Sequence, residues 1–527
     1  MKTTSKSTLL KGTVILSISA FLVKILSATY RVPFQNIVGD EGFYVFQQVY
    51  PIYGIASIMA LEGLPLFISK LVAESDDNLS TLRQLNSIRR MIWLICLVFF
   101  FFFLIFATPL AELMGDTRLS SLIRVTAFLF LLVPNLALYR GYMQGKLMLE
   151  GTAISQLIEQ VLRVMVIIAS AIMLQKGLLE NVYQIGVVAS TGAIIGAAGA
   201  VMYITRVTRK ENALISFEHV TEKVDNTRAL WKRLLSEGGM ICLYAALLVV
   251  FQLVDSFMMK NALVASGVSE LEAKIIKGAF DRGQPLAQVG MVISTALVIG
   301  QLPNLMQLKK ELGELYQTRF KQLMKLATIV GLAATVGLMA LVPELNVGLF
   351  GDNKEVPAIR VFLVVVALMS VIQMLQVIAQ TNHANKLLLK VSVIGIATKC
   401  LLSYPLIYWW GSIGASLSTL FGLMVILGCL YYKVYLKEAG SAIPYYLTHL
   451  VLLLVVMYLT VVGLRYAFHS LGMTDLFSER VSAILFAVTA AIIGGFLFCY
   501  GMIKTHLITK DEYEVFSVDK VIKKIKR

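Results

Sequence analysis

The amino-acid sequence predicts an all-α polytopic membrane protein, on its composition and on the spacing of its apolar runs. The chain has 527 residues, of which 57% are hydrophobic and 15% charged, and its mean hydropathy is +0.77. A soluble chain of this length would carry about 25% charged residues. Apolar runs long enough to cross a bilayer recur from residue 10 to residue 503. The connections between them are too short for a folded soluble domain.

These runs divide into fourteen candidate spans. The longest connection predicted to be cytoplasmic, residues 207–233, separates six spans from eight, as polar interruptions between two transporter bundles often do. A weak echo supports two bundles, because "ALEGLP" (Ala60 to Pro65) has a counterpart in "ALVIGQLP" (Ala296 to Pro303). The spans are residues 10–34, 43–72, 91–114, 119–142, 151–175, 182–206, 234–260, 278–306, 319–346, 358–382, 387–410, 412–436, 444–468 and 480–503.

The basic residues predict the orientation. With a cytoplasmic N-terminus, most of the Lys and Arg that lie between the spans fall on the inner side of the membrane. This bias follows the positive-inside rule, and an even number of spans also places the C-terminus inside. The formal charge of +15 therefore reflects topology, and we expect no nucleic-acid partner. The five cysteines and five histidines have no ligand-like spacing, so we expect no disulfide and no metal site.

Ionisable residues inside the spans need an explanation, because a cation at mid-depth costs at least about 2.5 kcal/mol. Glu159 and Arg163 are spaced i,i+4 and are expected to neutralise each other. Lys70 and Arg360 lie near span ends and can extend to the membrane surface, and Arg124 is only about one turn into its span. We interpret these five residues as structural.

Lys24 and Arg31 are less readily explained as structural residues. They lie about two helical turns apart on one face of the first span, and Lys24 lies roughly 21 Å beyond the expected helix start. Arg31 is nearer the outer face, where it can also serve as an anchor. Glu62, near mid-depth of the second span, has no basic neighbour one turn away. It is therefore expected to be protonated or paired across helices with Lys24 or Arg31.

The second half of the chain adds Arg282 in "DRGQP" to these candidates. The expected cavity is lined by more cations than anions, with Lys24, Arg31 and Arg282 as its principal positive charges. Guanidinium groups bind phosphate bidentately and lysine acts as a point charge, so the cavity suits an anionic ligand. The alternative is an internal salt-bridge cluster that locks the fold. Second-tier cavity residues are Asp255, Asp281 and Lys399.

Two quoted stretches, "LLKGTVILSISAFLVKILSATYRVPFQNIVGDEGFYVFQQVYPIYGI" and "EGLPLFISKLVAE", carry a family resemblance. They resemble the polysaccharide-biosynthesis and stage V sporulation protein B branch of the multidrug/oligosaccharidyl-lipid/polysaccharide (MOP) exporter superfamily. That branch includes lipid II flippases of the MurJ type. The likeness covers essentially the whole chain, including "DRGQPL".

The resemblance implies two pseudo-symmetric six-helix lobes and two extra C-terminal helices. The domains would be an N-lobe (1–206), a linker (207–233), a C-lobe (234–436), the last two spans (437–503) and a basic cytoplasmic tail (504–527). It also implies substrate-binding roles for four residues. They are Lys24 and Arg31 on the first helix, Glu62 on the second and Arg282 on the eighth. Lysine at position 24, where Gram-negative flippases typically have arginine, departs from the pattern and leaves bidentate binding there in doubt.

We therefore expect a non-enzymatic flippase in the bacterial plasma membrane, with both termini cytoplasmic. It would move an undecaprenyl-pyrophosphate-linked sugar precursor, lipid II first, to the outer leaflet as a monomer without a cofactor, driven by the membrane potential or an ion gradient. A teichoic, capsular or exopolysaccharide repeat unit is the next substrate. A cation-coupled multidrug exporter would require an acid-rich cavity. A membrane glycosyltransferase or polymerase would require a larger outer loop than "GDNKEVPA" (Gly351 to Ala358).

Overall fold

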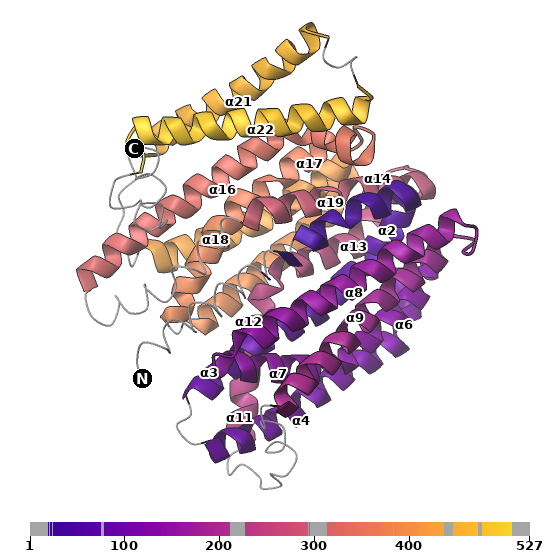
Figure 1. Ribbon diagram of the computed structural model, residues 1–527, viewed down its shortest axis with the longest axis vertical. Helices are drawn as coiled ribbons and strands as arrows, with labels where there is room; N and C mark the ends of the chain where they lie inside the picture. The colour runs from indigo at the N-terminus through magenta and orange to yellow at the C-terminus, as the bar shows by residue number, and fades with distance from the viewer. Residues whose placement is uncertain are drawn as a thin grey trace. The chain divides into compact units, whose positions relative to one another are not determined.

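The chain is helical throughout the residues that the structure describes. The computed structural model describes residues 19, 22–23, 25–74, 78–210, 227–292, 295, 313–382, 384–436, 446–472 and 477–508, and these contain no strand (Figure 1). Eleven helical runs among them are long and apolar enough to cross a membrane. The prediction of an all-α polytopic membrane protein is therefore confirmed.

Two of these runs are too long for a single crossing. Ile25–Glu74 has 50 residues and Asn385–Tyr435 has 51. A straight helix of that length would be about 75 Å long, whereas the hydrocarbon core of a bilayer is about 30 Å thick. Each run contains one non-helical glycine with positive φ, Gly39 at 72° and Gly411 at 57°. Both glycines fall at predicted breaks between spans.

Contacts across the two glycines show that the chain reverses there. The Arg31 guanidinium carbon lies 4.6 Å from the centroid of the Tyr50 ring, although a straight helix would separate the two residues by about 28 Å. Across the second glycine, Lys399 Nζ lies 3.0 Å from Ser418 Oγ. The eleven runs thus overlap thirteen of the predicted spans. Two spans, 10–34 and 278–306, lie partly outside the described residues, so the count of fourteen is consistent with the structure without being confirmed.

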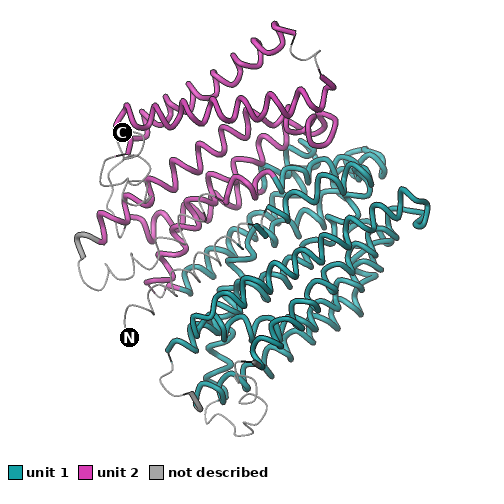
Figure 2. Tube along the Cα trace, viewed as in Figure 1, with its two compact units in different colours: residues 1–285, 385–418 teal, residues 286–384, 419–527 magenta. Residues whose placement is uncertain are grey.

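The helices pack as two compact units (Figure 2), Met1–Pro285 with Asn385–Ser418, and Leu286–Ala384 with Thr419–Arg527. The bounds of the predicted lobes differ from those of the units, and the lobes stay a prediction. The first unit contains α2 (Arg31–Ile58), η1 (Met59–Gly63), α3 (Leu64–Glu74), α4 (Asn78–Ile105), α5 (Ala107–Leu113), η2 (Thr117–Leu119), α6 (Ser120–Ala127), η3 (Phe128–Leu131), α7 (Val133–Gly145), α8 (Leu149–Gln175), α9 (Val182–Lys210), α11 (Thr227–Arg233), η4 (Leu234–Gly238), α12 (Gly239–Ala245), α13 (Leu247–Ala265), α14 (Glu270–Phe280) and most of α19 (Asn385–Leu430).

The second unit is built on a long helix that the last two spans cover. Its helices are α16 (Gly313–Phe350), α17 (Val356–Phe362), α18 (Val364–Thr381), the end of α19, η5 (Tyr431–Tyr435), α21 (Tyr446–Ser470) and α22 (Glu479–Lys504). A buried cluster that includes Leu341, Val461 and Phe486 joins α16 to α21 and α22. These three helices therefore share one apolar core.

Apolar side chains also cover the outside of the helices. On α4, buried Ile88 and Ile92 face the core, while Leu94, Val98 and Phe101 are exposed. An exposed apolar face on a helix long enough to cross a membrane is the surface that lipid covers. This distribution agrees with the membrane location that composition predicts.

A π-helical turn, η1, interrupts the second span where the sequence reads "MALEG". Arg140 Nη1 donates a hydrogen bond of 3.3 Å to the carbonyl oxygen of Ala60 within this turn. A Cβ atom at Gly63 would lie 2.3 Å from Cys242 Sγ, so the absence of a side chain there lets α12 pack closely. Such turns occur frequently at functional sites, and this one carries Glu62.

Gly278 provides a test of how α14 packs against α2. A Cβ atom at position 278 would lie 2.1 Å from the backbone oxygen of Asp40, which cannot rotate away as a side chain would. We expect Gly278→Ala to lower the free energy of unfolding by about 1–3 kcal/mol, measured as a lower thermal midpoint in detergent. Gly428→Ala is the matched control, because nothing lies within 4 Å of its Cβ. Equal midpoints for the two variants would contradict the close packing.

Candidate functional site

Arg31 is fully buried at the start of α2, at 0% exposure. Its three guanidinium nitrogens have no hydrogen-bond partner among the described residues. The guanidinium lies instead over the ring of Tyr50, at 4.6 Å from the centroid, where a cation–π interaction stabilises it. Lys24, the other predicted cation of this span, lies outside the described residues, so its place beside Arg31 stays a prediction.

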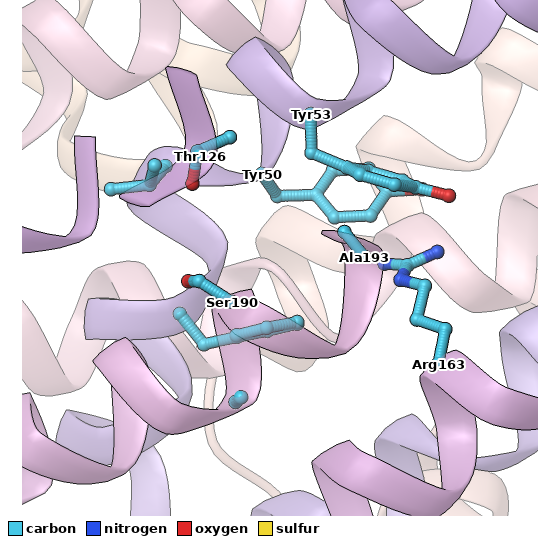
Figure 3. A pocket seen from close by; sticks show the side chains of 9 residues that line it. Tyr50, Tyr53, Thr126, Arg163, Ser190 and Ala193 are labelled. Atoms are coloured by element: carbon cyan, nitrogen blue, oxygen red, sulfur yellow. The ribbon is translucent and has the colours of Figure 1, made fainter. Parts of the chain in front are cut away.

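Helix α8 brings a second guanidinium to the same tyrosines. The Arg163 guanidinium carbon lies 3.7 Å from the ring centroid of Tyr53 and 5.7 Å from that of Tyr50. Its Nη2 donates to the hydroxyl of Tyr30 at 3.1 Å. Figure 3 shows the Arg163 guanidinium beside the side chains of Tyr50 and Tyr53. Sequence reasoning missed this cluster because it assigned Arg163 to an ion pair within its own helix.

Arg140 on α7 takes the carboxylate that the sequence had assigned to Arg163. Arg140 Nη2 lies 2.8 Å from Glu159 Oε2, and its Nε donates to Ser155 Oγ at 3.0 Å. The prediction that Glu159 and Arg163 neutralise each other is therefore wrong. A partner on a facing helix reaches the carboxylate directly, while the Arg163 guanidinium packs against tyrosine rings.

Glu62 lies in the π-helical turn η1 and is exposed. It forms no ion pair with Arg31 or with any other residue in the described ranges. Its predicted partner Lys24 lies outside them. The structure places Glu62 on a different part of the Ile25–Glu74 run from the Arg31–Tyr50 contact. The role of Glu62 as a counter-ion stays a prediction.

Arg282 and Asp281 follow α14 and are both bound by charges of opposite sign. Arg282 Nη2 lies 2.5 Å from Asp40 Oδ1, and Asp40 also accepts a hydrogen bond of 2.6 Å from Gln35 Nε2. Asp281 accepts two hydrogen bonds from Lys277 Nζ, at 2.5 and 2.7 Å. In this conformation both residues belong to internal ion pairs that fix the end of α14.

The second-tier residues Asp255 and Lys399 form a pair that sequence spacing did not reveal. Lys399 Nζ on α19 lies 2.5 Å from Asp255 Oδ1 on α13, and both side chains are buried. The ammonium also donates to Ser418 Oγ at 3.0 Å and to the Ala415 carbonyl at 3.2 Å. This set of acceptors holds one positive charge between α13 and the two arms of the α19 hairpin.

A further cluster joins α14 to the connection after α5 and to the start of α9, on the predicted outer side. Lys274 Nζ lies 3.0 Å from Asp116 Oδ2 and donates to the Tyr183 hydroxyl at 2.7 Å. Tyr183 in turn donates to Asp116 at 2.6 Å. Nearby, Lys260 donates to the carbonyl of Gly115. The only sequence signal for this cluster was the presence of basic residues in an outer connection that should be poor in them.

Comparisons with known proteins agree with this architecture. A family model described as polysaccharide biosynthesis protein matches residues 9–309. A Bacillus subtilis relative described as an uncharacterized membrane protein, YabM, is 32% identical over 95% of this chain and 93% of its own. The lipid II flippase MurJ of the same organism is 24% identical over 94% and 95% of the two chains. Its stage V sporulation protein B is 24% identical over 80% and 82%.

Solved structures share the fold. A lipid II flippase MurJ in an inward closed conformation superposes with a TM-score of 0.65, at 14% identity, over 93% of this chain and 100% of that one. An inward-facing multidrug resistance MATE family transporter gives a TM-score of 0.63, at 15% identity, over 81% and 98%. On the matched family model and the 32% identical relative, the chain belongs to the polysaccharide biosynthesis protein family, and it shares the fold of MurJ and MATE transporters.

Proposed function

We propose that this protein is a flippase that moves undecaprenyl-pyrophosphate-linked sugar precursors from the cytoplasmic to the outer leaflet by alternating access. Lipid II is the leading substrate. The proposal is supported by the relative over nearly the whole chain that is a lipid II flippase, and by membership of a polysaccharide biosynthesis family. Substrates of this class carry a pyrophosphate, which needs cations inside a membrane-spanning carrier.

Arg31 is the observation that carries the proposal. It is a fully buried cation whose guanidinium nitrogens lack hydrogen-bond acceptors within the described chain. Burying a charge without a partner is costly, so such a group is suited to an anion that arrives with the substrate. Lys24 is proposed as a second, monodentate contact on the same face.

Arg282 would join this site by exchanging partners. Its guanidinium is held at 2.5 Å by Asp40 in the present conformation. A pyrophosphate offers the same oxygen acceptors with more negative charge, so it would compete with the Asp40 carboxylate. Glu62 would serve as the switchable counter-ion of the unloaded carrier. The membrane potential or an ion gradient would drive the return step.

Two other functions are kept as alternatives. A teichoic, capsular or exopolysaccharide repeat unit has the same lipid pyrophosphate chemistry and differs only in the sugar. A cation-coupled multidrug exporter shares the fold. Its cationic substrates would be repelled by Arg31 and Arg163, which have no carboxylate partner within the described residues. The interior charge therefore favours an anionic substrate.

Depletion of the protein tests the substrate directly. We expect the proposed lipid-linked precursor to accumulate in the cytoplasmic leaflet, because synthesis continues while translocation stops. The measurement is mass analysis of the extracted lipid-linked intermediates, with leaflet assignment by an outer-face enzyme or probe. Any paralogue with the same activity must be depleted as well. Lipid II that still reaches the outer leaflet, while another precursor accumulates, would show that lipid II is the wrong substrate.

Neutralising Arg31 or Lys24 tests the cation site. Arg31→Ala and Lys24→Ala are each expected to lower flipping of a labelled precursor in proteoliposomes about tenfold or more, the effect of losing a charged hydrogen bond. Arg124→Ala is the control, because Arg124 is exposed and bonded to Thr108. Full activity of either site variant, at normal membrane abundance, would remove the residue from the proposal.

Binding of inorganic pyrophosphate to the purified protein distinguishes the role of Asp40 from that of Arg282. Asp40→Asn is expected to tighten binding, since it removes the competing carboxylate, whereas Arg282→Gln is expected to weaken it. Asp352→Asn, in a connection outside this site, is the control. The measurement is the pyrophosphate concentration that gives half-maximal thermal stabilisation. A loss of binding in both site variants would mean that the pair is purely structural.

A further inference from the structure

Seven basic side chains are buried among the residues that the structure describes. Five of them lie within 4 Å of a carboxylate. These are Arg140, Lys260, Lys277, Arg282 and Lys399. The remaining two, Arg31 and Arg163, have tyrosines as their described partners and form no ion pair with any described carboxylate. Both guanidinium groups lie over the ring of Tyr50.

This arrangement concentrates, in one part of the bundle, two positive charges that have no carboxylate partner among the described residues. A cation–π contact contributes roughly 2 kcal/mol when it is desolvated, whereas an isolated buried ion costs several kcal/mol even after relaxation. Tyrosine rings therefore offset only part of the cost. In the other five cases a carboxylate offsets the cost of burying the cation. Glu159, one turn from Arg163, is already bound by Arg140. The local charge balance calls for an anion.

A cavity of about 20 Å³ lies beside Arg163. Its walls include Tyr50, Tyr53, Ser190 and Ala193, contributed by α2 and α9, and Figure 3 shows the side chains around it. Ser190 Oγ donates its hydrogen to the carbonyl of Gly186 at 2.7 Å. Arg163 is the charged residue among those that line the cavity. A cavity that holds one water molecule has a volume of at least about 10–15 Å³. The cavity thus admits one small ion and is too small for a pyrophosphate or a sugar.

We propose that this cavity binds a single monatomic anion, a halide such as chloride, with Arg163 as its charged ligand. The anion neutralises one of the two unpaired charges and thereby stabilises the first helical hairpin against α8 and α9. The site is distinct from the proposed substrate site, because it depends on Arg163 and excludes the substrate by size. It would operate whatever precursor the protein carries.

Halide binding to the purified full-length protein tests the proposal. The protein is held in detergent with gluconate as the only anion and without any lipid-linked substrate, and radioactive chloride binding is measured by equilibrium dialysis. We expect saturable binding of one chloride, competed by bromide and not by gluconate. Arg163→Gln is expected to weaken it about tenfold or more. Arg124→Gln, which removes an exposed guanidinium, is expected to bind as the unmodified protein does.

Ala193→Val keeps the proposal falsifiable if Arg163→Gln does not fold. This variant retains the charge and fills the cavity, so it is expected to lose chloride binding. Anomalous diffraction from bromide would locate the ion beside Arg163. Absence of saturable binding, or undiminished binding in Ala193→Val, would overturn the proposal. Chloride binding by a purified protein that flips none of the proposed precursors would support the halide site while contradicting the proposed function.

Discussion

Compensation of buried positive charge is the constraint on which the interior of this protein depends. Each cation inside a helical bundle in lipid loses its hydration and requires an acceptor. The structure meets this demand by joining helices that are distant in sequence, as when Lys399 reaches Asp255 and Arg282 reaches Asp40. The ion pairs therefore fix which helices are neighbours. Among the described residues, Arg31 and Arg163 are the buried cations that contact tyrosine rings and form no ion pair with a carboxylate.

Glycine makes these approaches geometrically possible. At Gly39 and Gly411 a positive φ reverses the chain, and each reversal brings a basic residue against the following span. At Gly278 the missing side chain lets α14 lie on the backbone of Asp40, within reach of the Arg282 pair. Close packing of the helix backbones therefore accompanies charge pairing, because a short ion pair requires that the two helices approach closely.

The sequence predicted the helical class and most of the spans, since apolar runs and break glycines are local signals. Arg31, Asp255 and Lys399 were also recognisable as candidates, because a charge in an apolar run is conspicuous. Their partners were not predictable. Asp255 and Lys399 are on different helices, and no spacing rule connects them. Arg163 was misassigned because the i,i+4 rule treats a helix as isolated, whereas Arg140 on the facing helix competes for Glu159. The π-helical turn at Glu62 likewise depends on tertiary contacts.

The distribution of ion pairs also bears on how a carrier of this kind can change conformation. On the predicted outer side, Lys274 and Arg282 bind Asp116 and Asp40, so the helices there are fastened by protein carboxylates. Opening that side would expose the same cations to solvent, which is far less costly than leaving them buried and unpaired. In the proposed transport cycle, an anionic headgroup that replaces a carboxylate would lower the cost further, because the cation would never lack a partner. Exchange of one anion for another would then require less free energy than breaking a buried ion pair outright.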